Sequence, residues 1–380
     1  MENPYICGPA IGIRGTFIGR KKEIKEIFDH IRKGESKSVV GERRAGKSSL
    51  LYHLTCADVQ REHLRGTSRR HVLVYFDCQG EFYSYELTED ELLDMLFATA
   101  MTAMNDLPEK ADFEKAYKAA ETKRHGFQNA VAMLNGLGVQ LTYLLDEFEL
   151  ITKQENLHDE TIDFLRSMAN NPNHLFAYVT ATQTSLWELC KSEKIKSPFW
   201  NIFTKLQLRL MPRQEALEIV KLGSENFCND VKAFVLEKAG CHPYLIQMMC
   251  GILFELRNRD AGFNQTHFRE GLRAFRSESR VYFEGCWRHY LDDEDKRMLK
   301  EILDKGDAVR NSLGDERKEI SVSKLPSENQ RRVEILIGRG YLEEINGRCR
   351  IFSSVFEDFV RDMPEPGKMV GKKGSGFYPL

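Results

Sequence analysis

Three apolar runs in the first half of the chain are predicted to form buried β-strands. They are His71–Asp77, Val139–Leu145 and Leu175–Thr180, and the pair Val39-Val40 is typical of the end of a further short strand. Each long run has the length and the nearly continuous apolar character of a strand that is covered on both faces. The pattern therefore predicts a buried sheet in this half of the chain.

Segments with apolar residues at helical spacing separate these strands. The first lies within residues 17–34 and has Gly34 as a suitable end. Further helices are predicted over residues 49–54, 89–104, 110–135 and 159–169. Strands that alternate with helices predict an α/β fold, in which helices lie on both faces of a parallel sheet.

The pattern changes after Pro198, where strand-like segments become scarce. Helices are predicted over residues 213–228, 230–239, 243–257, 264–276, 281–290, 293–304, 327–338 and 354–361. Within residues 341–352, two short strands joined by Asn346-Gly347 predict a β-hairpin. Helices with such a hairpin are typical of a winged helix.

These patterns divide the chain into four predicted parts, since a chain of 380 residues is too long for one typical core. They are an α/β core over residues 1–205, a helical lid over 206–276, a winged helix over 277–363 and a disordered tail over 364–380.

Composition and charge exclude several classes of protein. The chain has 55 Lys and Arg against 57 Asp and Glu, a net charge of −2 that gives no overall attraction to nucleic acid or anionic lipid. It has no secretory signal pattern and no apolar run long enough to span a bilayer, so no membrane partner is expected. Its nine scattered cysteines, without C-x-x-C spacing, are typical of free thiols and predict a cytoplasmic protein.

The octapeptide Gly41–Ser48 fits the P-loop pattern G-x-x-x-x-G-K-[ST], and it lies between a predicted strand and a predicted helix. Its glycines permit a tight loop whose N–H groups point at phosphate oxygens, and the helix N-terminus adds partial positive charge. Lys47 is expected to reach the β- and γ-phosphates, and the Ser48 hydroxyl to bind Mg²⁺. The nucleotide-binding residues predicted here are Gly41, Arg44, Ala45, Gly46, Lys47, Ser48 and Ser49.

An acidic pair at the end of the second long strand completes the predicted site. Asp146 is expected to hold Mg²⁺ through its water shell, because this ion keeps most of its waters. Glu147 is expected to orient or deprotonate the attacking water, so that Glu147 and Lys47 are the predicted catalytic residues. Thr180 and Thr182 end the third strand, where either hydroxyl is a candidate γ-phosphate sensor and ordinary strand filling is an equal alternative.

The ensemble resembles the STAND class of signal-transducing P-loop ATPases, which is related to archaeal-type ATPases and to the AAA+ ATPases of origin-recognition type. The residues that carry the resemblance are Asn3-Pro4-Tyr5, Phe17-Ile18-Gly19-Arg20, the P-loop with Arg43-Arg44, Leu144–Glu149, Ser197-Pro198-Phe199 and Gly240–Gln247. The resemblance covers roughly residues 3 to 362.

The resemblance implies a P-loop ATPase core, a lid and a winged helix that act as an ATP-driven switch. Arg20 would line the adenine side, and His242-Pro243 would couple the lid to ATP or ADP. A closed, ADP-bound form would open on a trigger, exchange ADP for ATP and assemble with further copies or with a separate effector or sensor protein. Where many relatives have Ser-Arg or Thr-Arg, this chain has Thr182-Gln183, which lacks the positive charge and predicts slow hydrolysis.

Two alternatives stay open beside a switch in signalling or defence. A DNA-binding initiator or transposition regulator would use the winged helix, although residues 320–362 hold seven basic against seven acidic side chains. Such a balance is unlike a phosphate-tracking surface, so DNA is the less favoured partner. A scaffold that binds ATP with little turnover is the other alternative, and it rests on Gln183.

Overall fold

The computed structural model describes residues 2–12, 15–82, 86–154, 156–157, 159–193, 195–223, 229–259, 265–311, 313–314 and 316–366. The chain forms two compact units. One is Gly8–Arg209, and the other combines Met1–Cys7 with Leu210–Leu380. The limit after Arg209 lies close to the core boundary predicted after residue 205, and the predicted domain limits themselves stay predictions.

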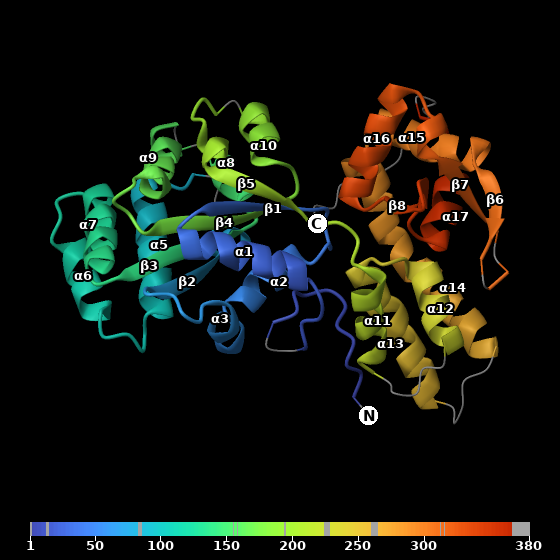
Figure 1. The fold of residues 1–380 in the computed structure, drawn as a ribbon, viewed down its shortest axis with the longest axis horizontal. Helices are drawn as coiled ribbons and strands as arrows, with labels where there is room; N and C mark the ends of the chain where they lie inside the picture. Colours follow the sequence, from blue (N-terminus) through green and yellow to red (C-terminus); the bar gives the residue numbers. More distant parts are fainter. Residues whose placement is uncertain are drawn as a thin grey trace. The chain divides into compact units, whose positions relative to one another are not determined.

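The unit Gly8–Arg209 is built on a five-stranded parallel sheet of order β2-β3-β4-β1-β5 (Figure 1). The strands are β1 (Ser36–Val40), β2 (Arg70–Asp77), β3 (Val139–Asp146), β4 (Phe176–Thr182) and β5 (Phe203–Gln207). β3 and β4 are buried along their whole length, as their continuous apolar sequences predict. The predicted parallel α/β fold is therefore confirmed, and β5 is a strand that the apolar pattern did not indicate.

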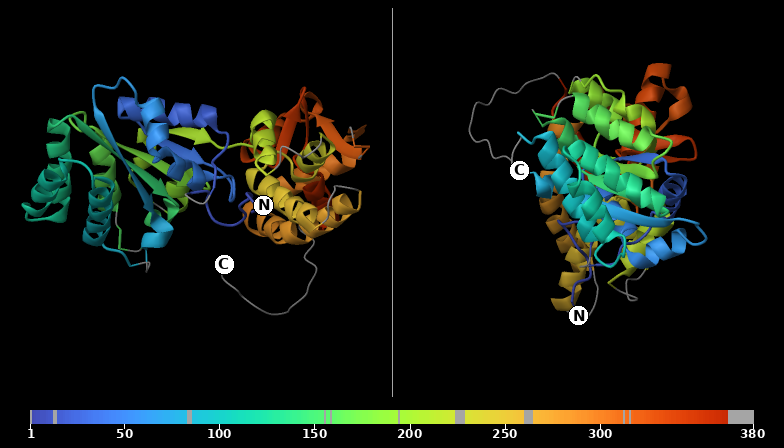
Figure 2. Two further views of the ribbon diagram at one scale, coloured as in Figure 1. Left: turned by 90° about the horizontal axis from the view of Figure 1, so that it is seen from below. Right: turned by 90° about the vertical axis from the view of Figure 1, so that its left-hand side faces the viewer.

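Helices cover both faces of this sheet, and Figure 2 shows the sheet and the helices from a second direction. One face packs against α1 (Lys21–Lys33) and α2 (Lys47–Leu54) in a core that includes Ile27, Leu50 and Leu144. The other face packs against α5 (Glu89–Ala103), α7 (Lys123–Gly136) and α9 (Asp159–Asn170). The shorter helices of the unit are α3 (Ala57–His63), α4 (Cys78–Glu81), α6 (Lys110–Lys118), α8 (Glu149–Thr152), α10 (Leu186–Ser192) and a 3₁₀ turn over Phe199–Ile202.

The single helix predicted over residues 110–135 is wrong, because α6 and α7 are separate. Thr122 precedes α7 and its side chain accepts a hydrogen bond from the His125 N–H, which starts a new helix. The turn also brings Gly126 close to the backbone of Tyr117, where a Cβ atom would lie 2.5 Å from the carbonyl oxygen. Apolar spacing alone did not reveal this break.

The second unit begins with the helices α11 (Arg213–Lys221), α12 (Asn229–Ala239), α13 (Pro243–Arg259) and α14 (Gln265–Gly285). α14 continues into a π-helical turn over Cys286–Tyr290. Two helices were predicted over 264–276 and 281–290, and this is wrong because α14 is continuous through residue 276. The predicted limit between lid and winged helix therefore falls inside one helix. The N-terminal segment belongs here, since the Tyr5 hydroxyl donates to the Val220 carbonyl at 2.6 Å.

The rest of this unit consists of α15 (Asp293–Lys305), α16 (Ser327–Arg339), α17 (Ser354–Asp362) and a four-stranded antiparallel sheet. The sheet has the order β6-β7-β9-β8, with β6 (Asp307–Arg310), β7 (Glu316–Ser321), β8 (Leu342–Ile345) and β9 (Arg348–Ile351). The hairpin β8–β9 is as predicted, with Asn346 and Gly347 at φ angles of 52° and 75°. Strands β6 and β7 were missed because both are rich in charged residues.

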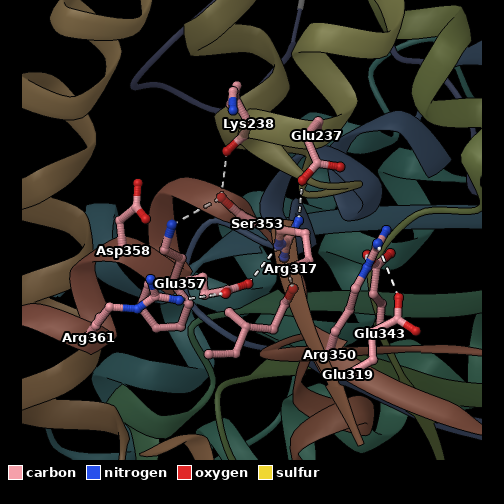
Figure 3. Close-up of polar contacts among 12 residues, drawn as sticks. Glu237, Lys238, Arg317, Glu319, Glu343, Arg350, Ser353, Glu357, Asp358 and Arg361 are labelled. Atoms are coloured by element: carbon pink, nitrogen blue, oxygen red, sulfur yellow. Dashed lines mark hydrogen bonds and ion pairs between the residues drawn. The ribbon is translucent and has the colours of Figure 1, made fainter. Parts of the chain in front are cut away.

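A buried arginine joins the helical and the β-rich parts of the second unit (Figure 3). Arg317 in β7 is 2% exposed and forms ion pairs with Glu237 of α12 and with Glu357 of α17, the latter at 2.6 Å. Its guanidinium also donates to the Ile351 carbonyl in β9. Four elements from both sides of residue 276 are thus tied together by one side chain.

The cysteines were predicted to be free thiols, and all of those in the described residues are free. Within the described ranges, no helix is long and apolar enough to cross a membrane. Residues 367–380 of the predicted tail, and residues 224–228 of the helix predicted over 213–228, lie outside the described residues.

Candidate functional site

The predicted P-loop forms the connection between β1 and α2. Gly41 follows β1, and its N–H donates to the carbonyl oxygen of Thr182 in neighbouring β4 at 3.1 Å. A side chain at Gly41 would meet Leu208, because an added Cβ atom would lie 3.1 Å from the Leu208 Cβ. Gly46, at the start of α2, has a φ of 92°, and there is open space where its Cβ atom would be. Both glycines are therefore needed for this loop.

Lys47 is the first residue of α2 and its side chain is buried inside the loop, with the residue only 5% exposed. The ammonium group donates to the carbonyl oxygens of Gly41 at 2.9 Å and Glu42 at 3.2 Å. The loop thus holds a positive charge in a protected position beside the N-terminus of a helix. Ser48 is the next residue and is partly buried.

Several predicted nucleotide-binding residues support the loop through their side chains. Arg20 is buried, and its guanidinium donates to the carbonyl oxygens of Ala45 at 3.3 Å and Arg209 at 2.9 Å. The Ser49 hydroxyl accepts a hydrogen bond from the Ile11 N–H at 2.8 Å. The Arg44 guanidinium donates to the Gly8 carbonyl. These contacts fix the shape of the loop.

The predicted acidic pair lies at the carboxyl end of β3, two strands away from β1 in the sheet. Asp146 is 2% exposed, and its Oδ2 accepts a hydrogen bond from the Tyr75 hydroxyl at 2.9 Å. Its Oδ1 accepts from the Glu147 N–H at 3.1 Å, and Glu147 has a φ of 50°. Burial and the Asp146 charge raise the pKa of Tyr75, so this hydroxyl keeps its proton and remains a donor.

Strand β4 lies between β1 and β3 in the sheet, and its end makes hydrogen bonds to the P-loop and to the acidic segment after β3. The Thr182 carbonyl accepts from the P-loop, while the Thr182 hydroxyl donates to the Thr184 carbonyl at 2.7 Å. The next N–H, of Gln183, donates to Oε1 of Glu149 at 3.4 Å. The sheet therefore brings Lys47, Asp146 and Thr182 to one edge.

Two residues of this edge were not assigned a role from the sequence. Glu149 is visible in the sequence as a third acid after Asp146 and Glu147, whereas Tyr75 carries no sequence signal. Burial, followed by the charge of Glu147, raises the pKa of Glu149 to about 7, while the Lys47 ammonium acts in the opposite direction.

His242 and Pro243 belong to the other unit, where they lie at the start of α13. The His242 ring packs against Tyr282 and Phe352, and its Nε2 is 3.1 Å from the Tyr282 hydroxyl. Gly240, just before, has a φ of 65° and approaches the Phe352 backbone so closely that a Cβ atom would lie 2.5 Å from the carbonyl oxygen. These contacts account for a fixed turn, and a nucleotide contact of His242 stays a prediction.

Comparison with known families identifies the class of this site. The model of the family described as Novel STAND NTPase 2 matches residues 32–300, which include the P-loop and the acidic end of β3. The chain belongs to this family. The STAND resemblance stated from the sequence is therefore confirmed.

Solved structures share the fold of this STAND NTPase. A Walker-type ATPase of Pyrococcus abyssi has 17% identity and a TM-score of 0.53, over 93% of this chain and 98% of that protein. The ORC2 protein of Aeropyrum pernix, determined as ADPNP–ADP complexes, has 10% identity and a TM-score of 0.51, over 95% of this chain and 96% of that protein. No curated protein matches the sequence.

Proposed function

We propose that the chain is an ATP-binding and ATP-hydrolysing switch. The observation that carries this proposal is the placement of Lys47 and Asp146 at one edge of the sheet of a STAND NTPase, on strands separated only by β4. A phosphate-binding loop and an acidic strand end in this order are the two elements that phosphoryl-transfer catalysis requires.

The loop has the properties of a phosphate site. Gly46 leaves open space at the start of α2, where backbone N–H groups and the helix dipole favour an anion. Residues 41–49 would hold the phosphates of ATP or ADP, and Lys47 would supply positive charge. Ser48 and the buried Asp146 would hold Mg²⁺, which neutralises phosphate charge when bound.

Glu147 would orient or deprotonate the attacking water, since it adjoins Asp146 and starts the turn that leaves β3. Thr182 would sense the γ-phosphate through its hydroxyl, which donates to the Thr184 carbonyl at 2.7 Å in this structure. Arg20 would act on nucleotide indirectly, because its guanidinium holds the Ala45 carbonyl of the loop. His242 and Pro243 would transmit the nucleotide state to α13, which Pro243 begins.

The outcome of ATP binding would be a conformational change with assembly into an oligomer or with a separate effector or sensor protein, in signalling or defence. Light scattering with ADP, and then with a non-hydrolysable ATP analogue and Mg²⁺, tests this. A larger assembly only with the analogue supports the switch. An unchanged mass with full nucleotide binding contradicts self-assembly and directs the search to a partner protein.

A DNA-binding ATPase is the second candidate, and the hairpin β8–β9 after α16 favours it. The charges do not, because five arginines of this region are engaged with acids, namely Arg332, Arg339, Arg348, Arg350 and Arg361. Arg332 pairs with Asp295 at 2.9 Å, and Arg350 pairs with Glu343 at 2.6 Å. Duplex binding that falls steeply with salt would support this candidate. Nucleotide binding without turnover would instead support a scaffold.

A further inference from the structure

Glu149 is a third carboxyl group at the end of β3, beyond the two that the proposed mechanism uses. It begins α8, and the residue is only 9% exposed. Its Oε1 accepts a hydrogen bond from the Gln183 N–H, but its buried Oε2 has no hydrogen-bond partner in the described part of the chain. Burying a charged oxygen without a donor costs free energy, so this arrangement does not serve the fold.

A short series of hydrogen bonds connects Glu149 to the P-loop. The Lys47 ammonium donates to the Gly41 carbonyl at 2.9 Å, and the Gly41 N–H donates to the Thr182 carbonyl at 3.1 Å. The following N–H, of Gln183, donates to Glu149 at 3.4 Å. Glu149 and Lys47 are therefore held on adjoining parts of one rigid edge of the sheet.

The charge of Glu149 is what requires an explanation. A neutral glutamine has the same shape, and its carbonyl oxygen would accept the Gln183 N–H equally well. The negative charge is therefore not needed for this bond, and it lies close enough to Lys47 for the ammonium to favour it. Only two of the three Lys47 ammonium protons are used within the loop, on the carbonyls of Gly41 and Glu42.

We propose that Glu149 competes with the nucleotide phosphates for Lys47. In the empty site its negative charge partly neutralises the Lys47 ammonium, and when a nucleotide is bound the same charge repels the phosphates. This inference rests on the proposed function and adds a form of regulation to it. Variants of one complex differ in affinity mainly through their dissociation rates, so a lower affinity for phosphate shortens the lifetime of bound ADP. Glu149 thereby sets how readily ADP is exchanged for ATP.

The test compares the wild type with Glu149→Gln and with the control Glu91→Gln. Glu91 also lies in the first turn of a helix and accepts a backbone N–H, that of Thr88 at 2.9 Å, but it is exposed and lies in α5. Calorimetry gives the dissociation constants of ADP and of a non-hydrolysable ATP analogue, and stopped-flow with a fluorescent ADP gives the dissociation rate.

Glu149→Gln is expected to bind ADP about tenfold more tightly than the wild type at low salt, with an advantage that shrinks as salt rises. Its ADP dissociation is expected to slow by a similar factor, and Glu91→Gln is expected to match the wild type. Equal or weaker binding by Glu149→Gln, with a wild type that binds, overturns this inference alone. A wild type that binds no nucleotide overturns the proposed function and the inference together.

Discussion

Replacing Glu149 by glutamine should stabilise the nucleotide-free protein, and it should do so only above acidic pH. Burial and the Glu147 charge raise the pKa of Glu149 from an ordinary value of 4.5 to about 7. A shift of roughly 2.5 pKa units corresponds to about 3 kcal/mol, at 1.36 kcal/mol per unit. This is a large part of the stability of an ordinary domain.

The direction in which stability changes with pH follows from proton binding by Glu149. Between pH 4.5 and about 7 the folded chain binds the Glu149 proton more tightly than the unfolded chain, so the stability that this proton contributes is lost as pH rises through that window. Glutamine has no proton to lose. The variant should therefore equal the wild type near pH 4.5 and exceed it by up to about 3 kcal/mol at pH 8.

Other ionisable groups lie close to Glu149, and comparing Glu149→Gln with the wild type removes most of their effect on the measured stability. They are Glu147 and Lys47, which act directly on Glu149, and Asp77, Cys78 and Asp146, which share the same end of the sheet. They are present in both proteins, so the difference between variant and wild type isolates Glu149. The thiol of Cys78 stays protonated throughout, because burial and these carboxylates raise its pKa.

Urea unfolding at pH 5 and pH 8 measures this difference. The chain has two compact units, so the signal must come from the unit that holds Glu149. Of the three tryptophans, Trp187 and Trp200 lie in this unit, and a Trp287→Phe background leaves fluorescence from them alone. A stability difference that is the same at both pH values, or a variant less stable than the wild type at pH 8, would refute the reasoning.

Outcomes are expected for four further variants. Lys47→Ala should abolish nucleotide binding in calorimetry, and unchanged affinity would remove the P-loop assignment. Glu147→Gln should keep binding but lose turnover in a phosphate-release assay, and full activity would exclude Glu147 as the base. Arg317→Leu should destabilise its unit by about 3–5 kcal/mol in urea unfolding, because it removes the partner of the Glu237 carboxylate and one of the two partners of the Glu357 carboxylate. Arg276→Ala should cost below about 1 kcal/mol, since its pair with Asp358 is half exposed, and an equal cost for both would contradict this.

The parts of the fold that could be predicted are those whose signal is local. The strands β3 and β4 are continuous apolar runs, and the P-loop is a fixed spacing of glycines, lysine and serine. Strand β7 spans Glu316–Ser321. Its charged residue Arg317 can be buried there because it forms ion pairs with Glu237 and Glu357, which lie on helices distant in the sequence. No local pattern reports such a partner, so β7 was missed.

The candidate site divides in the same way. Lys47 and Asp146 could be predicted because each belongs to a short motif, whereas the roles of Arg20 and Tyr75 depend on contacts across the fold. Arg20 reaches the carbonyl of Arg209, which lies 189 residues further along the chain. Tyr75 reaches Asp146 only because β2 and β3 are parallel neighbours in a register that pairs Tyr75 with Leu144.

The two expected effects of Glu149 have one origin, and this makes them a joint test. A charge that is costly in the empty site is also repelled by phosphate, so replacing it should raise stability and nucleotide affinity together. A residue that serves only the fold would lower stability when replaced, and a residue that holds the nucleotide would lower affinity. The combination of higher stability at pH 8 with slower ADP release is expected only if the Glu149 carboxylate opposes the ligand that Lys47 attracts.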